Sequence, residues 1–379
     1  MRLAGAVWIA LALVGPGAHA FELCDSAAKT AEFHEALVAK VESAFHQKRF
    51  GELDGLLNGL LDGHRLGRID DARLKRAFQA FETQDAGFEP MILEWTRQQP
   101  RSAAAYLALG YHYMARGLAL AVPNRDGIAK TQAEAAGREL TYAWKAFDTS
   151  DRLGARPTLS NAARVRIGLA AGKPGNPDAT ALYRRTIRRY PDALEVRIQY
   201  LKGPGGSTQA ALDRIDRAIR DAGKMSESDR RYMRYLGLQQ KGLVLAAAGE
   251  NRRAAQEYES SYPLCPGLPR SIKLAIEAYD RLGDGEGLER TADALLQRDD
   301  RNCWALTLRA KARKLNGRLA QSFADYSRGV ELACGPAFDG LAWFHENGRF
   351  VPRDLRKAAE LYGIADARGV AGARQKAES

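Results

Sequence analysis

A spacing of 34 residues recurs in the C-terminal half of the chain. Gly249, Gly283 and Gly317 stand at helix-breaking positions and follow one another at this spacing. Nine residues after each glycine, and seven before it, small or aromatic residues recur: Tyr258, Ala292 and Tyr326, and Gly242, Ile276 and Ala310. A fixed period of this length is typical of arrays in which one supersecondary unit stacks on its copies. The spacing therefore predicts a row of similar helix pairs between residues 235 and 336.

The period and the residue types resemble the tetratricopeptide repeat. In such a pair, small residues let two antiparallel helices cross closely, and one large side chain fills the remaining gap. The first and third units show this pattern: Gly242, Ala254, Ser261 and Tyr258, then Ala310, Ser322, Gly329 and Tyr326. In the middle unit Ile276 and Leu288 replace small residues. We expect an all-α fold, an α-solenoid of antiparallel helix pairs.

Residues 337–370 resemble the Sel-like variant of this repeat, in which a longer loop joins the two helices. The resemblance rests on Glu346, Asn347, Gly348, Val351, Asp354, Lys357, Ala358, Leu361, Tyr362, Ala365 and Gly369. The segment continues the register of the preceding units, so we expect one solenoid that ends here. Residues 371–379 are small and polar, and are expected to fray.

Residues 21–205 are predicted to form an N-terminal helical domain with looser, degenerate pairs, and residues 206–336 to form the repeat solenoid. One N-terminal pair is separated by an insertion at 118–137, and its two helices are marked by Tyr106, Leu109, Gly110 and Tyr113, then by Ala143, Phe147 and Ser150. Residues 31–207 also resemble a bacterial domain family of unknown function, through Trp95, Pro100 and Ser102, residues 113–117, and residues 204–207. That resemblance implies no activity.

The first twenty residues have the pattern of an export signal. Arg2 precedes an apolar run at 6–14, and Ala18-His19-Ala20 fits a small-x-small cleavage site. We expect cleavage after Ala20 and a periplasmic or secreted protein; an uncleaved anchor is the alternative. No other run approaches the length of a membrane span, so the mature chain is expected to have none.

The chain is basic, with a formal net charge of +11. Residues 181–234 concentrate this charge, with thirteen Lys and Arg against seven Asp and Glu. Export argues against a nucleic-acid partner. We interpret the basic segment as a solvated helix face.

Four cysteines remain after export, and none has the spacing of a metal site. Cys303 opens the first helix of the third repeat and Cys334 closes its second, so the two ends of an antiparallel pair meet. We expect a Cys303–Cys334 disulfide. Cys265 has Cys24 as its other candidate, and that pairing stays open. Four reduced, buried cysteines are the alternative.

Catalytic signatures are not found in the sequence. None of the histidines left after export forms an HExxH motif, and no GxSxG, P-loop or dinucleotide fingerprint is present. The paired carboxylates Asp70-Asp71 and Asp299-Asp300 lie where helix caps or turns are expected. We therefore predict a protein without cofactor, metal or catalytic activity. An unrecognised envelope hydrolase is the alternative, and a deep pocket holding a carboxylate of raised pKa would favour it.

The leading interpretation is a scaffold that binds a protein or peptide partner in the cell envelope. Stacked pairs leave a concave surface lined by their first helices. An aromatic floor with cations around it suits an extended peptide that carries carboxylates, and the oligomeric state is left open. The predicted groove residues are Arg270, Lys273, Trp304, Thr307, Lys311, Lys314, Phe338 and His345. Trp304 and Phe338 could instead pack between repeats. A third interpretation is a purely structural or self-associating solenoid whose groove is not used.

Overall fold

A computed structural model describes residue 24 and residues 27–121, 129–170, 178–203, 207–268 and 270–378. These described residues form α-helices and short 3-10 turns, and no strand. The predicted signal, part of the 118–137 insertion and residues 204–206 lie outside them. The α-helices of the N-terminal half are α2 (Ala27–His46), α3 (Phe50–Arg65), α4 (Asp71–Phe78), α5 (Phe88–Gln98), α6 (Ala103–Leu120), α7 (Lys130–Arg152), α8 (Thr158–Ala170), α9 (Ala179–Arg189), α10 (Leu194–Lys202) and α11 (Thr208–Arg220).

The remaining helices continue at similar lengths to the C-terminal end. They are α12 (Glu227–Ala247), α13 (Asn251–Ser261), α14 (Arg270–Leu282), α15 (Gly285–Leu296), α16 (Cys303–Leu315), α17 (Leu319–Glu331), α18 (Gly335–Asn347), α19 (Leu355–Ala367) and α20 (Ala373–Glu378). The 3-10 turns are η1 (Gln79–Phe81), η2 (Asp221–Lys224) and η3 (Tyr262–Leu264).

The chain divides into two compact units. Unit 1 comprises residues 1–241 and 264–268, and unit 2 comprises residues 242–263 and 269–379. The division falls inside α12, whereas the boundary near residue 205 stays a prediction.

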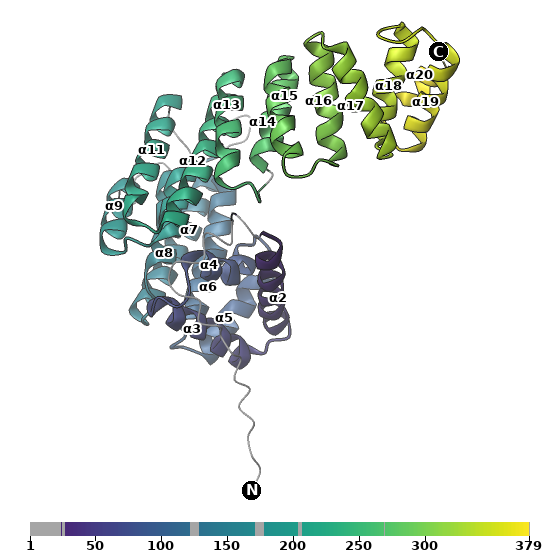
Figure 1. Cartoon of the computed structure of the whole chain (residues 1–379). Coiled ribbons are helices and arrows are strands. Elements are labelled where there is room, and N and C mark those ends of the chain that lie inside the picture. Colours follow the sequence, from purple (N-terminus) through teal and green to yellow (C-terminus); the bar gives the residue numbers. More distant parts are fainter. Residues whose placement is uncertain are drawn as a thin grey trace. The chain divides into compact units, whose positions relative to one another are not determined.

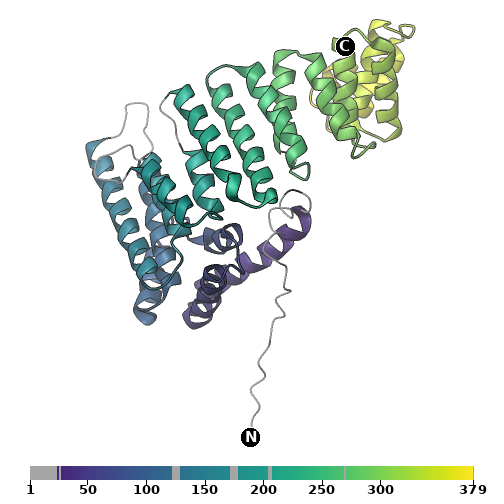
Figure 2. The same cartoon turned by 60° about the vertical axis from the view of Figure 1, so that its left-hand side comes forward.

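Unit 2 is a row of antiparallel helices, and Figures 1 and 2 show α13 to α19 following one another in chain order. Each helix from α13 to α20 contacts the next along the chain. Such nearest-neighbour packing defines a solenoid. The glycines of the 34-residue period lie in the turns, where Gly249, Gly283 and Gly317 have φ angles of +81°, +64° and +74°. Glycine adopts this left-handed conformation without a side-chain penalty, so it ends the first helix of each pair.

Small residues allow close helix crossings in this unit, as the sequence predicts. A Cβ added at Gly242 would lie 2.6 Å from Cδ1 of Tyr258, the residue expected to fill the crossing. In the middle pair, a Cβ added at Gly287 would likewise lie 2.5 Å from Cγ of Tyr279. The glycine therefore sits on the second helix there, and the tyrosine on the first. This exchange explains why the middle repeat lacks the usual small residues.

Unit 1 has a large core in which helices distant in sequence meet. The helix pair α6 and α7 packs with Gly110 against the ring of Phe147, in agreement with the spacing of the N-terminal pair. α4 also contacts α8 and α10, which follow it by many residues. Aromatic side chains fill the core around Trp95, which is fully buried.

The C-terminal end differs from the frayed tail that its composition suggests. Residues 373–378 form α20, which packs on α19. Ala373 is fully buried, and Lys376 forms an ion pair with Asp339 at 2.7 Å. The preceding loop, residues 348–354, joins α18 to α19 where the Sel-like pattern places a longer connection. The burial of Ala373 and the ion pair of Lys376 thus fix α20 on the unit, although most residues of this segment are polar.

Two disulfides are present. Cys303 and Cys334 are joined across the ends of α16 and α17, with a Cα separation of 5.5 Å. Cys24 is joined to Cys265 in unit 1, with a Cα separation of 4.4 Å, which decides the pairing that the sequence leaves open. Among the described residues, no helix is both long and apolar enough to cross a membrane.

Candidate functional site

Exposed cations and one exposed tryptophan lie on the first helices of the pairs in unit 2. Arg270 and Lys273 lie on α14, are exposed, and have no ion-pair partner in the described part of the chain. Trp304 begins the matching stripe on α16 and is 39% exposed. Lys311 follows it two helical turns later, on the same face. We refer to Arg270, Lys273, Trp304, Lys311 and Lys314 as the first-helix face.

Contacts between neighbouring helices hold this face together. Lys311 on α16 pairs with Asp280 on α14 at 2.5 Å, and both side chains are partly exposed. The ammonium of Lys314 lies 4.2 Å from the ring centre of Trp343 on α18. Burial lowers the pKa of Lys314, and the neighbouring cations Lys376 and Lys311 act in the same direction, against Asp339. Two contacts therefore join neighbouring helices of this face, Lys311 with Asp280 and Lys314 with Trp343.

Three of the expected groove residues are buried or half-buried and are not fully exposed on that surface. Thr307 is buried, and its hydroxyl donates to the carbonyls of Cys303 and Trp304, each at 3.0 Å. Phe338 is buried among residues of α19, and the guanidinium of Arg368 lies over its ring. His345 is half-buried beside Phe323. For Phe338 the interpretation as a packing residue between helices is therefore the correct one.

A shift in register explains the position of Phe338. α16 begins at Cys303 and α18 at Gly335, two residues earlier than a strict 34-residue period would place it. Pro336 occupies the first turn of α18, a position that favours proline. The shift moves Phe338 inward and brings Asp339 and Trp343 to the face instead. Sequence reasoning missed Trp343, and Pro336 was the signal that could have revealed it.

A buried polar cluster in unit 1 has the residue types of a catalytic site but no access for a substrate. His64 Nε2 lies 2.7 Å from Asp71 Oδ1, and the Thr158 hydroxyl donates to the same oxygen at 2.7 Å. Asp70 caps α4, as expected, but Asp71 is buried rather than capping. Burial acts to raise the pKa of Asp71, yet the hydrogen bonds from His64 and Thr158 leave it lowered. The cluster ties α3, α4 and α8 together.

Glu195 has the raised pKa that the hydrolase alternative requires of a carboxylate, but it does not line either of the pockets described below. It is 7% exposed, and burial raises its pKa, while Lys75 and Gln199 act against this shift. Its Oε1 accepts a hydrogen bond from Gln199 at 2.6 Å, and its backbone N–H donates to Asp71. Neither of the two pockets described below is lined by Glu195. A raised pKa at a residue that lines neither of these pockets gives no support to a hydrolase.

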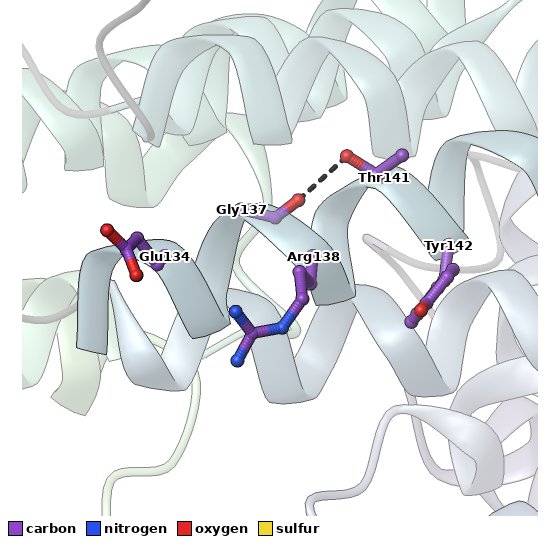
Figure 3. A pocket seen from close by; sticks show the side chains of 5 residues that line it. All are labelled: Glu134, Gly137, Arg138, Thr141 and Tyr142. Atoms are coloured by element: carbon purple, nitrogen blue, oxygen red, sulfur yellow. Dashed lines mark hydrogen bonds between the residues drawn. The ribbon is translucent and has the colours of Figure 1, made fainter. Parts of the chain in front are cut away.

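A shallow hollow lies along α7 (Figure 3). All of its lining residues come from this one helix: Glu134, Gly137, Arg138, Thr141 and Tyr142. The Thr141 hydroxyl donates to the Gly137 carbonyl at 2.8 Å, so it is already satisfied within the helix. A ligand site needs groups that converge from several elements. This hollow has one carboxylate and one guanidinium on a single helix, and no candidate activity follows from it.

Comparisons with known proteins add little to these observations. No protein-family model matches the chain, and no curated protein matches it. Among solved structures, the crystal structure of the yeast Tom70 is similar with a TM-score of 0.28 and 11% sequence identity, over 92% of this chain and 89% of that one. This likeness is too weak to transfer a function. The stacked pairs of unit 2 decide the class of fold by themselves. The chain is a helical-repeat protein.

Proposed function

We propose that this protein is an exported, non-catalytic scaffold that binds an acidic, extended segment of a partner protein in the cell envelope. The observation that carries the proposal is the first-helix face of unit 2. There, Arg270 and Lys273 are exposed without ion-pair partners among the described residues, beside the half-exposed ring of Trp304. The export signal remains a prediction on residues 1–20, and two disulfides support an oxidising compartment.

The chemistry of this face suits a peptide with carboxylates. A tryptophan that is partly exposed on a rigid helix is a good anchor for binding, because little entropy is lost when it is covered. The free guanidinium and ammonium groups attract carboxylates and fix the direction of the chain. Lys311 already pairs with Asp280, and Lys314 lies over the ring of Trp343. These two lysines therefore contribute to the shape of the surface more than to binding of the peptide. We propose further that the fourth pair belongs to the Sel-like type.

The test uses a labelled peptide of stated chemistry. The probe is a fluorescein-labelled, extended peptide of glutamate and leucine that ends in a free carboxylate, and binding is followed by fluorescence anisotropy. Reversing two charges in Arg270→Glu/Lys273→Glu should weaken binding roughly a hundredfold, since the removed attractions become repulsions. The matched control is Arg356→Glu/Lys357→Glu, two exposed cations on α19.

The control reverses the same number of charges on a second helix of the same unit, so it should leave binding within about threefold of the wild type. Circular dichroism of both variants checks that the helices are retained. Equal binding by the wild type and Arg270→Glu/Lys273→Glu would show that the first-helix face is not the site.

A further inference from the structure

A basic pocket lies in unit 1, on the segment that the sequence presents only as a solvated basic face. It has a volume of about 610 Å³, which falls in the range of small-molecule sites. Side chains converge on it from α9, from α10, which contacts both α9 and α11, and from the end of α11 with η2. Figure 1 shows α9 and α11 in the same part of this unit. The lining residues are Arg184, Ile187, Arg188, Arg197, Arg217, Arg220, Asp221, Gly223 and Lys224.

The charge of this pocket is one-sided. Six of the lining residues are cations, and Asp221 is the one carboxylate. That carboxylate is already engaged, since its Oδ2 accepts a hydrogen bond from the Tyr183 hydroxyl at 3.0 Å. The C-terminal ends of α9 and α11 each add only about half a negative charge. Cations therefore exceed all negative groups at the pocket.

Apart from Arg197, the cations of the pocket are exposed or half-buried, and no neighbouring carboxylate among the described residues pairs with them. Arg184, Arg188, Arg217, Arg220 and Lys224 have no ion-pair partner within the described ranges. Two partly buried arginines elsewhere in the chain, Arg309 and Arg116, are by contrast paired with Asp325 and Glu139. Like charges gathered in a concavity repel one another and raise the local concentration of anions. Binding of an anion would remove that repulsion.

Arg197 is the group that most distinguishes this pocket from an ordinary basic surface. It is 1% exposed, and it has no carboxylate within ion-pair distance in the described part of the chain. Its Nη1 donates to the Ala193 carbonyl at 2.8 Å and its Nη2 to the Asp221 carbonyl at 3.1 Å, but its Nε has no hydrogen-bond partner. A buried guanidinium without a counter-ion is costly, and a bound anion would offset that cost. Burial also lowers the pKa of Arg197.

We propose that this basic pocket binds a small anion with two or more phosphate groups. Arginine presents a planar fork of N–H donors that matches phosphate oxygens, and the pocket offers five arginines from three directions. Several separate cations are best matched by several phosphates. Ile187 is the one lining residue with an apolar side chain, so an organic partner with large apolar groups has little to contact. The phosphates can belong to a free oligophosphate or to a lipid headgroup.

The test is calorimetric titration of the full mature chain with inorganic tripolyphosphate. Arg184→Ala/Arg188→Ala should weaken binding roughly tenfold or more, since two charge-assisted hydrogen bonds are lost. The matched control is Arg185→Ala/Arg189→Ala, which removes equal charge from exposed positions of the same helix that do not line the pocket. The affinity of the control for tripolyphosphate should stay within about twofold of the wild type, because charges outside the pocket act on the anion only at long range and are screened by salt.

A second arm separates the two sources of phosphate. Vesicles of phosphatidylcholine containing cardiolipin, whose headgroup carries two phosphates, are added in competition with tripolyphosphate. Displacement identifies a lipid headgroup as the ligand type, and its absence identifies a free oligophosphate; both results keep the proposal. Three results would overturn it: no binding of tripolyphosphate by the wild type, equal loss in the two double variants, or tighter binding of a hexaglutamate peptide than of tripolyphosphate.

Discussion

At Gly242, the absence of a side chain permits the crossing of α12 with α13. The ring of Tyr258 occupies the space where a Cβ would lie. We predict that Gly242→Ala lowers the free energy of unfolding by about 1–2 kcal/mol, because overpacking outweighs the gain in helix propensity. Urea denaturation measures the change. Gly363 on α19 is the control, since nothing lies within 4 Å of a Cβ there, and Gly363→Ala should stabilise by about 0.5–1 kcal/mol. A loss of stability in both variants would contradict this account.

Glu195 gives a pH dependence of defined sign. In the unfolded chain it ionises near its ordinary pKa of about 4.3, whereas burial raises its pKa in the folded chain. As the pH rises through this window, the unfolded state loses its proton first, so the folded state loses stability. Glu195→Gln removes this loss. The free energy of unfolding of the variant, relative to that of the wild type, should therefore rise as the pH increases from about 4, and should level off above the raised pKa of Glu195. Urea titrations at a series of pH values measure it, and a constant difference would refute it.

Prediction from sequence worked best at single residues that have one geometric task. Gly242, Tyr258 and the turn glycines were identified because each of them is required by local geometry. The sequence pattern predicts a helix-capping role for Asp71, but the side chain is buried and contacts His64. Its partners Thr158 and Glu195 are 87 and 124 residues away, so no local pattern reveals them.

Among the elements, α15, α16 and α17 are joined by a network of charges. Arg309 on α16 holds both carboxylate oxygens of Asp325 on α17, at 2.8 and 3.0 Å, and contacts Asp293 on α15 at 2.9 Å. Arg313 donates to Asp325 as well, at 2.8 Å. The Asp325 side chain is only 6% exposed, so these contacts lie inside the repeat.

Removing Asp325 should be strongly destabilising. We predict that Asp325→Ala lowers the free energy of unfolding by about 3–5 kcal/mol, because two guanidinium groups lose their buried counter-ion. The control is Asp300→Ala, whose ion pair with Arg328 is largely exposed and should contribute about 0–1 kcal/mol. Thermal unfolding followed by circular dichroism compares the two. Similar effects of both substitutions would show that burial does not decide the strength of the pair.

The period of the helices was predictable, but its local irregularities were not. A strict 34-residue register places Phe338 on the surface, whereas the early start of α18 at Gly335 turns it inward. The start of a helix depends on its cap and first turn, here Cys334 and Pro336, and these override the average period. In the same way, Ala373 and Lys376 build α20 from contacts that the composition of the tail does not show.

At the scale of the whole molecule, the disulfide between Cys24 and Cys265 is the longest covalent link, with a sequence separation of 241 residues. It packs with Tyr235 in a small buried cluster of unit 1. Replacing both cysteines, in Cys24→Ala/Cys265→Ala, should lower the free energy of unfolding by up to about 5 kcal/mol in the chain-entropy model. Peptide mapping without reductant checks the pairing in the purified protein. A free thiol at Cys24, or its linkage to Cys334, would contradict it.

The sequence showed where positive charge is concentrated but not that it lines a pocket. Thirteen cations between residues 181 and 234 fit a solvated face on composition alone. Arg197 changes this interpretation, because it is buried and lines the pocket with cations from α9 and α11. Convergence of side chains from three elements is a property of the tertiary structure, and periodicity along one helix does not contain it.

The two disulfides also determine which segments can carry a mechanical load. When the chain is pulled from its two ends, the force passes from Cys24 directly to Cys265 and from Cys303 directly to Cys334. The loops so bypassed correspond to about 800 Å and about 100 Å of extended chain. Of the helices that the structure describes, α14 and α15, and then α18, α19 and α20, lie on the path of the force. Among the described helices, stretching would therefore unravel these five, while α16 and α17 and the helices between Cys24 and Cys265 bear no tension along their backbone.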